Sequence, residues 1–249
     1  MAGDPRAEPR GRGTRPVGAL VVVAAGLLLA ACAGPSPSAA GPVSTTPVAP
    51  STLPPTTTLA PTTTLPPTTT TVDVGALPQT DALPSPDAPS FQAAMQALFA
   101  AVVSGTPGSA GAAFFPEAAY VQLKDIGDAA GDFTGRLEAE YDLDIMAAHD
   151  QLGPWATGAT LTSVVVPMQY AHWIPPGVCD NGIGYFEVAN SRLVYAEDGV
   201  TRSFGIASLI SWRGEWYVVH LGAILRPGPG GTVLDPGPGP GVSEPSTTC

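Results

Sequence analysis

The chain has 249 residues, including 29 glycines and 29 prolines, and charged residues make up only 12% of it, which predicts long segments without a packed core. The first 31 residues hold two acids and four arginines, so 19 acids and 6 bases remain beyond them, a net charge of −13. An acidic surface of this kind repels nucleic acids and anionic lipid headgroups, which excludes both as expected partners.

The N-terminal segment has the features of a bacterial export signal. Four arginines precede an uncharged run from Val17 to Ala31, which is too short for a transmembrane helix. The run ends in Leu29-Ala30-Ala31-Cys32, which resembles the lipobox of bacterial lipoproteins. That resemblance implies a signal peptide over residues 1–31, cleavage before Cys32 and acyl chains on Cys32. An uncleaved membrane anchor and a secreted protein without lipid are the alternatives.

The lipoprotein resemblance also implies a location. The protein is expected at the outer face of the cytoplasmic membrane, in or beyond the cell-wall layer, and several acyl chains on one cysteine hold a protein firmly there. Lys124 is the only lysine amid abundant Ala, Gly, Pro and Arg, a bias typical of GC-rich bacteria such as actinobacteria.

Residues 32–87 are predicted to be a disordered linker. Three six-residue repeats, each ending in three threonines, run from Leu53 to Thr70 and carry too little apolar surface to pack. Proline favours extended polyproline II, so the segment would act as a semi-rigid spacer. Clusters of Thr and Pro resemble O-glycosylated stalks, and an unmodified linker is the alternative.

Residues 88–226 are predicted to form the globular domain, beginning with three helices. The first has apolar residues at helical spacing from Phe91 to Val102 and ends at Gly105. A short second helix follows Pro116 and continues to Leu123. The third is capped by Asp132, and its apolar face comprises Phe133, Leu137, Tyr141, Ile145 and Leu152.

Four strands are expected after Gly158, over residues 161–170, 185–195, 201–212 and 215–221. Asp198-Gly199 and Arg213-Gly214 are turn signals that make the last three strands an antiparallel meander. The turns pair Leu193 with Phe204 and Ile206 with Leu221. One face would pack on the helices, and the other would carry Phe186, Val188, Val194, Leu209, Trp216, Val218 and His220. This second face needs cover from sheet curvature or from a second copy in a homodimer.

Residues 227–249 are rich in Pro-Gly pairs and are predicted to be a disordered tail. Helices followed by an antiparallel meander indicate an α+β roll. The order of elements resembles the NTF2-like and cystatin-like superfamilies, in which helices close one side of a curved sheet. In the NTF2-like group the cone between helices and sheet is a ligand pocket, a catalytic site or a filled core.

No motif predicts catalysis, a metal or a cofactor. The histidines His149, His172 and His220 lack the spacing of zinc ligands, and each is expected to pack or to cap a helix. There is no Gly-x-Ser-x-Gly element and no glycine-rich phosphate loop. The acids of the third helix, Glu138, Glu140, Asp142 and Asp144, are expected on its solvated face.

Glu187 is the one acid that the predicted register places in the cone. It would lie opposite Ile210 and level with Tyr217, with Ser208 on the same face. A carboxyl group in an apolar cone would have a raised pKa and could act as an acid or a base. The alternative is that Glu187 lies at the rim, or that a bulge at Asn190 turns it outward.

If lipid occupies Cys32, then Cys179 and Cys249 remain in an oxidising compartment. A disulfide between them would tie the tail to the domain. Alternatively, Cys179 is buried while Cys249 is free or paired with another molecule.

These features favour a lipid-anchored, non-catalytic domain that binds a partner in the cell envelope. A small-molecule or lipid carrier that uses the cone is the second hypothesis, and an NTF2-like enzyme with Glu187 or a histidine as base is the third.

Overall fold

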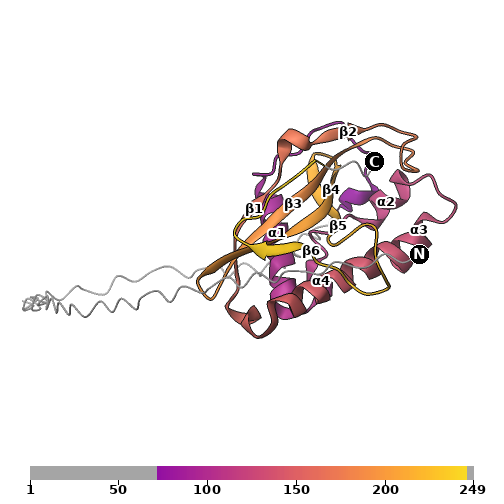
Figure 1. Cartoon of the computed structure of the whole chain (residues 1–249). Coiled ribbons are helices and arrows are strands. Elements are labelled where there is room, and N and C mark those ends of the chain that lie inside the picture. Colours follow the sequence, from indigo (N-terminus) through magenta and orange to yellow (C-terminus); the bar gives the residue numbers. More distant parts are fainter. Residues whose placement is uncertain (1–71, 246–249) are drawn as a thin grey trace, which may run out of the picture. The chain divides into compact units, whose positions relative to one another are not determined.

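A computed structural model describes residues 72–245 (Figure 1). The predicted signal peptide, Cys32, most of the linker and Cys249 therefore lie outside the described residues. Among residues 72–245 no helix is long and apolar enough to cross a membrane. The described part is an α+β domain, as predicted, but its antiparallel sheet has six strands instead of the four expected, because His172–Ile174 forms a separate strand and Leu234–Pro238 adds another.

All the described helices except η5, which follows the first strand, precede the sheet in the chain. The helices comprise η1 (Val74–Ala76), α1 (Pro89–Ser104), η2 (Pro107–Ala110), α2 (Glu117–Leu123), α3 (Ala129–Asp132), the π-helical η3 (Phe133–Glu138), α4 (Ala139–Leu152), η4 (Gly153–Gly158) and η5 (Met168–Tyr170). The predicted third helix is thus α3, η3 and α4 in succession, and it starts earlier than predicted because Asp128, and not Asp132, caps it through the Gly131 amide (2.9 Å).

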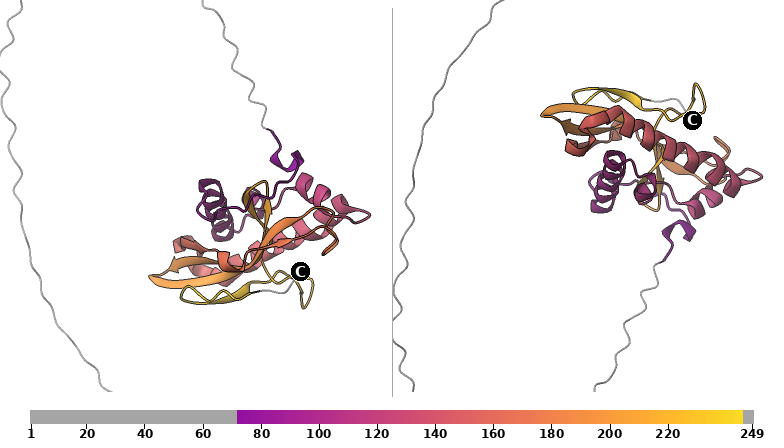
Figure 2. Two further views of the ribbon diagram at one scale, coloured as in Figure 1. Left: turned by 90° about the horizontal axis from the view of Figure 1, so that it is seen from above. Right: turned by 90° about the horizontal axis from the view of Figure 1, so that it is seen from below.

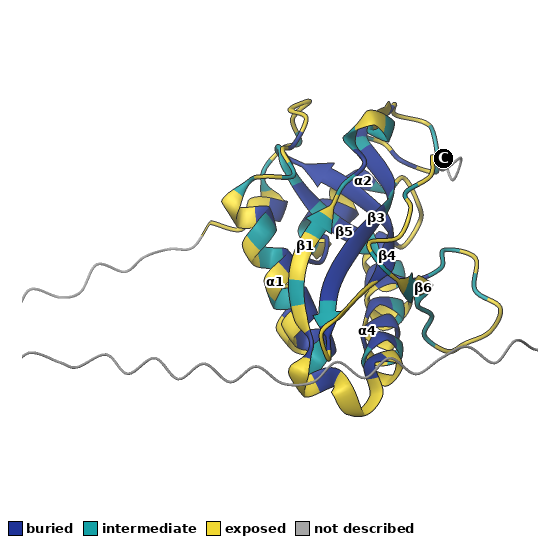
Figure 3. Ribbon diagram, turned by 60° about the vertical axis from the view of Figure 1, so that its left-hand side comes forward, coloured by how far each residue is buried: buried dark blue, intermediate teal, exposed yellow. Residues whose placement is uncertain are grey.

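Two long strands form the centre of the sheet. They are β3 (Tyr185–Glu197) and β4 (Val200–Trp212), and Figure 3 shows them buried along most of their length. Strand β3 pairs with β4 along one edge and with β1 (Thr160–Val165) and β2 (His172–Ile174) along the other. The other edge of β4 pairs with β5 (Glu215–His220) and β6 (Leu234–Pro238).

Both predicted hairpins form. Leu193 pairs with Phe204, and Glu187 pairs with Ile210, so the register predicted for β3 and β4 is confirmed. The register of β4 and β5 holds from Trp212 to Leu209, where a bulge shifts it and pairs Ser208 with His220. The predicted pairing of Ile206 with Leu221 is therefore wrong, and His220 shares a face with Ser208 instead of lying on the opposite one.

Aromatic side chains join the helices to the sheet. The Phe99 ring of α1 lies 5.3 Å from that of Tyr195 and 6.5 Å from that of Phe204. Phe115 meets Trp212 edge to face at 6.0 Å. Such pairs add to the stabilisation that burial alone provides.

The second sheet face is covered within the chain. Val188, Leu209, Trp216 and Val218 are all buried. Val218 exchanges backbone hydrogen bonds with Ala113 (2.9 Å) and Phe115 (3.0 Å), which protects the edge of β5. A homodimer through this face stays a prediction, but these residues no longer motivate it.

Residues 72–87, predicted to be linker, pack on the domain. The Trp212 indole donates to the Val74 carbonyl (3.1 Å), and the Gln79 amide donates to the Ser211 carbonyl (2.8 Å). The described residues before α1 thus belong to the folded domain, because polar groups of the sheet find partners in them.

Residues 227–245, predicted to be disordered, also belong to the domain. Strand β6 lies along β4 (Figure 2). Arg192 donates to the carboxylate of Asp235 (2.9 Å). Gly231 permits a close approach to α4, because a Cβ at this position would overlap the Leu143 carbonyl. The prediction of a disordered tail is therefore wrong for the residues that the structure describes.

Candidate functional site

A cavity of about 110 Å³, which we call the cone cavity, lies between the helices and the sheet. Its walls come from α2, η3, the loop before β3, the sheet and the segment after β5. The lining residues are Tyr120, Leu123, Lys124, Arg136, Leu137, Asn181, Tyr185, Glu187, Ser208, Ile210, Val219, His220 and Ile224. Of the polar lining residues, only Glu187 and Ser208 were predicted from the sequence to line a pocket.

Glu187 lies in the cavity wall, with 4% of its surface exposed. Its Oε1 accepts a hydrogen bond from the Ser208 hydroxyl (2.9 Å), and its Oε2 is buried without a hydrogen-bond partner among residues 72–245. The β3–β4 register passes Asn190 without a shift, so no bulge turns Glu187 outward. Of the three predicted pocket residues, Glu187 and Ser208 line the cavity, whereas Tyr217 does not. Tyr217 packs edge to face against Phe115 at 6.0 Å.

Asn181 provides a second unpartnered acceptor. Its Nδ2 donates to the Val178 carbonyl (2.8 Å) and the Tyr185 hydroxyl (3.1 Å), while its buried Oδ1 has no partner within the described residues. Burial, followed by the nearby Glu187, raises the pKa of Tyr185 to about 12, so its hydroxyl keeps its proton.

Two cations also line the cavity. The Lys124 ammonium donates to the Cys179 carbonyl (2.9 Å), and burial, followed by the charge of Arg136, lowers its pKa. Arg136 projects from η3, where the π-helical turn interrupts the regular helix. It donates twice to Asp132 (2.8 and 2.6 Å) and once to the Tyr120 hydroxyl (3.1 Å).

His220 is the histidine that reaches the cavity. Burial, followed by the charges of Arg136 and Arg226, lowers its pKa to about 4, so the imidazole is neutral near pH 7. The bulge opposite Ser208 places it there. His149 instead contacts the Val102 carbonyl (2.9 Å), and His172 is exposed and contacts the Tyr170 carbonyl (3.0 Å). No cluster of metal-ligating side chains is present among residues 72–245.

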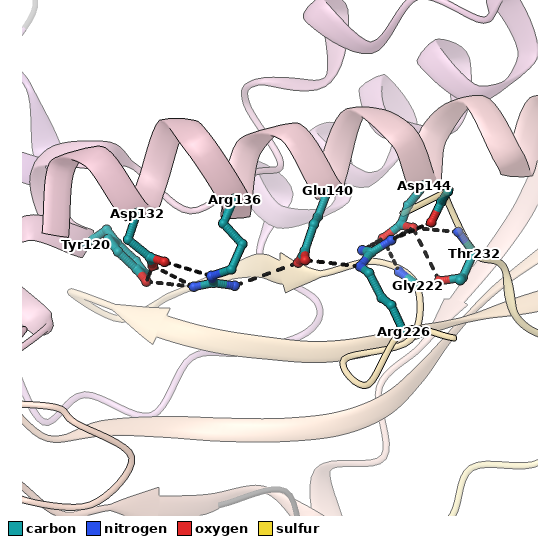
Figure 4. A network of polar contacts seen from close by, with 9 residues as sticks. Tyr120, Asp132, Arg136, Glu140, Asp144, Gly222, Arg226 and Thr232 are labelled. Atoms are coloured by element: carbon teal, nitrogen blue, oxygen red, sulfur yellow. Dashed lines mark hydrogen bonds and ion pairs between the residues drawn. The ribbon is translucent and has the colours of Figure 1, made fainter. Parts of the chain in front are cut away.

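A polar network leads from the cavity along one face of the long helix (Figure 4). Asp132, Arg136, Glu140 and Asp144 follow each other at four-residue spacing, and Arg226 binds the last two. Asp144 is 1% exposed, so the expectation that it lies on a solvated face is wrong. It accepts from the amides of Gly222 and Thr232 (both 2.8 Å), which fixes the segment that carries Ile224 in the cavity wall.

Cys179 is disulfide-bonded. Cys249 lies outside the described residues, so its pairing with Cys179 stays a prediction. The cysteine follows Pro175-Pro176-Gly177-Val178, in the loop whose carbonyl at Cys179 holds Lys124. A covalent constraint on this loop therefore also acts on the cavity wall.

The site residues come from four separate parts of the chain, and only the hairpin register of Glu187 and Ser208 could be read from sequence. No family model, curated protein or solved structure matches this chain.

Proposed function

We propose that the protein is a lipid-anchored extracytoplasmic protein whose domain binds a small polar molecule in the cone cavity, without chemical conversion. The observation that carries this proposal is the pair of buried acceptors in the cavity wall, Glu187 Oε2 and Asn181 Oδ1, which have no partner within residues 72–245. An unpaired buried polar group costs about 1–3 kcal/mol, which a ligand with O–H or N–H donors would recover.

The cavity restricts the size and the charge of the ligand. Its volume of about 110 Å³ is smaller than the ~150 Å³ cavity that holds benzene in an engineered protein, so the ligand has few non-hydrogen atoms. Lys124 and Arg136 repel a cationic ligand. Leucine, isoleucine and valine side chains complete the wall. A neutral molecule with hydroxyl or amide donors at one end and an apolar part at the other matches this lining.

The electrostatics favour binding over catalysis. His220, with a pKa of about 4, is a weak base, whereas an efficient catalytic base has a pKa near the working pH. Lys124 and Arg136 are held by hydrogen bonds to protein oxygens.

The anchor remains part of the proposal, supported by the lipobox resemblance at Cys32 and the Pro/Thr segment after it. Cys32→Ser should leave the precursor without acyl chains. Incorporation of a radiolabelled fatty acid into the wild type, but not into Cys32→Ser, would support it. Equal labelling of the two would contradict it.

The ligand proposal can be tested on the full chain in detergent. Saturation-transfer NMR with ethanol, 1,2-propanediol, glycerol and acetamide, each as a separate probe, measures whether any molecule of this class enters. We expect at least one to bind, and Glu187→Gln to weaken it by about tenfold through loss of a charge-assisted hydrogen bond. Glu138→Gln removes an exposed acid of η3 and is the matched control.

A variant that fills the cavity provides a second test of the ligand proposal. Ile224→Trp adds volume from the segment after β5 and should abolish probe binding while the unfolding temperature stays close to that of the wild type. If no probe binds, or if Glu187→Gln and Ile224→Trp leave binding unchanged, the cavity holds only water and the proposal fails.

A further inference from the structure

A second hollow lies on the surface between η4, the β3–β4 hairpin and β6, and we refer to it as the Trp155 groove. It has a volume of about 450 Å³ and shares no lining residue with the cone cavity. The lining residues are Gln151, Leu152, Gly153, Pro154, Trp155, Tyr195, Glu197, Arg202, Pro236, Gly237 and Pro238.

Trp155 presents an apolar aromatic surface to solvent. It is 57% exposed, the most exposed of the large aromatic side chains in the described residues. Gly153, with a φ of 58°, ends α4, and Pro154 follows it, so the chain turns sharply and carries the indole away from the core. Trp155 also lines a neighbouring hollow together with Asp198. The indole ring is held at a turn and flanked by two hollows, so its face is suited to stacking against a ligand.

Glu197 lines the same groove and has an unpartnered acceptor among the described residues. The side chain is 7% exposed, and its Oε2 lies 2.7 Å from the Nε of Arg202. Its Oε1 is buried and has no hydrogen-bond partner among residues 72–245. Since an unpaired buried carboxyl oxygen is costly, a donor from a ligand in the groove would stabilise it.

Arg202 provides the matching donors. Its side chain is 44% exposed, and only its Nε is engaged with Glu197. The terminal nitrogens make no hydrogen bond within the described part of the chain. The groove therefore places the carboxylate acceptor of Glu197 beside the planar guanidinium donor of Arg202, and the Trp155 ring lines the same groove.

We propose that the Trp155 groove is a binding site for a neutral saccharide. The C–H groups of a sugar ring carry partial positive charge and match the negative face of an indole, while vicinal hydroxyls both donate and accept, as Glu197 and Arg202 require. A cationic ligand is disfavoured by Arg202, and an anionic one by Glu197 and by the acidic domain. The proposal does not depend on a ligand in the cone cavity.

The test uses the full chain in detergent and the methyl glycosides and disaccharides of glucose, galactose and N-acetylglucosamine as probes. Saturation-transfer NMR reports sugar binding, and the part of the tryptophan emission that Trp155→Ala removes reports the surroundings of Trp155. We expect at least one saccharide to bind, Trp155→Ala to weaken it by more than tenfold, and Trp155→Phe to retain part of the affinity because a ring remains. Glu197→Gln should weaken binding several-fold.

Matched controls separate the groove from other surfaces. Trp173→Ala removes another exposed indole, 38% exposed on β2, and Glu187→Gln alters only the cone cavity. Both should leave saccharide binding unchanged, whatever they do to binding in the cone. The proposal is overturned if no saccharide binds, or if Trp155→Ala and Trp155→Phe leave saccharide binding unchanged. It is also overturned if tetramethylammonium is the only probe whose binding depends on Trp155.

Discussion

Arg226 donates from Nη1 and Nη2 to the two carboxylate oxygens of Asp144, at 2.8 and 2.7 Å, although 82 residues separate them in the chain. The Asp144 side chain is fully enclosed and that of Arg226 is 10% exposed. Bidentate pairs of this kind are strong and directional. The pair fixes the segment after β5 on α4 and so closes the cone cavity.

Removal of this carboxylate should therefore destabilise the whole domain. We expect Asp144→Ala to lower the free energy of unfolding by about 3–5 kcal/mol, because the buried Arg226 loses its bidentate partner and is left with the longer ion pair to Glu140. Urea unfolding followed by circular dichroism measures it. Asp142→Asn, on the exposed side of the same helix turn, should change the free energy by less than about 0.5 kcal/mol.

A double-mutant cycle isolates the ion pair. Arg226→Met combined with Asp144→Asn should be more stable than either single variant, since an apolar replacement removes both buried charges. Strict additivity of the two single changes would show that the Asp144 effect comes only from its hydrogen bonds to Gly222 and Thr232.

The buried His220 predicts a loss of stability in mild acid. Its pKa is about 4 in the folded chain and about 6.5 in the unfolded one, so between these values the unfolded state binds more protons. The stabilisation is complete above pH 6.5 and falls as the pH drops towards 4, by on the order of 3 kcal/mol in total. Asp132, whose pKa is lowered by Arg136, adds a further loss only below its ordinary pKa of 3.8.

The check is the slope of unfolding free energy against pH. The wild type should lose stability between pH 6.5 and 4, and His220→Gln should flatten the curve over that interval while leaving the loss below pH 3.8. Because Arg136, Arg226, Lys124 and Asp144 act on His220 through their charges, the comparison is made at constant ionic strength. An identical slope in the variant would show that His220 does not titrate in this range.

The hairpin pairing was predictable because local turn signals determine it. Asp198-Gly199 and Arg213-Gly214 adopt left-handed φ angles, so they set the register of β3 with β4 and the start of that of β4 with β5. The same register placed Glu187 and Ser208 in the cone. The bulge at Ser208 has no such local signal, and it moved His220 to the other face.

The remainder of the site depends on contacts far apart in the sequence. Lys124 reaches the Cys179 carbonyl across 55 residues, and Arg226 reaches Asp144 across 82. Composition predicted disorder at both ends of the domain, since segments rich in Pro and Gly usually lack a core. Here residues 72–87 and 227–245 pack on the sheet through backbone groups, which composition does not reveal.

The segment before α1 should be resistant to proteolysis in the folded protein. The Gln79 side chain bridges the Ser211 carbonyl (2.8 Å) and the Arg213 amide (2.6 Å) at the end of the β4–β5 hairpin. Gln79→Ala leaves both backbone groups without this partner and should cost about 1 kcal/mol and speed cleavage within residues 72–87. Thr80→Ala, whose side chain makes no contact of this kind, is the control. Equal cleavage rates in Gln79→Ala and the wild type would mean that Gln79 does not hold residues 72–87 on the domain.

The disulfide at Cys179 leads to a last prediction about the C-terminus. The chain has three cysteines, so if Cys32 carries lipid, the partner of Cys179 is Cys249. Thiol labelling of the native protein should find no free Cys179, and Cys249→Ser should expose one. In that variant the loop after Val178 loses a covalent constraint, and because the Cys179 carbonyl holds Lys124 at 2.9 Å, binding in the cone cavity should weaken while saccharide binding in the Trp155 groove does not change. Peptide mapping under non-reducing conditions identifies the partner directly. A peptide joining Cys179 to Cys32 would contradict both this pairing and lipidation at Cys32, because one sulfur cannot carry a disulfide and a thioether-linked lipid.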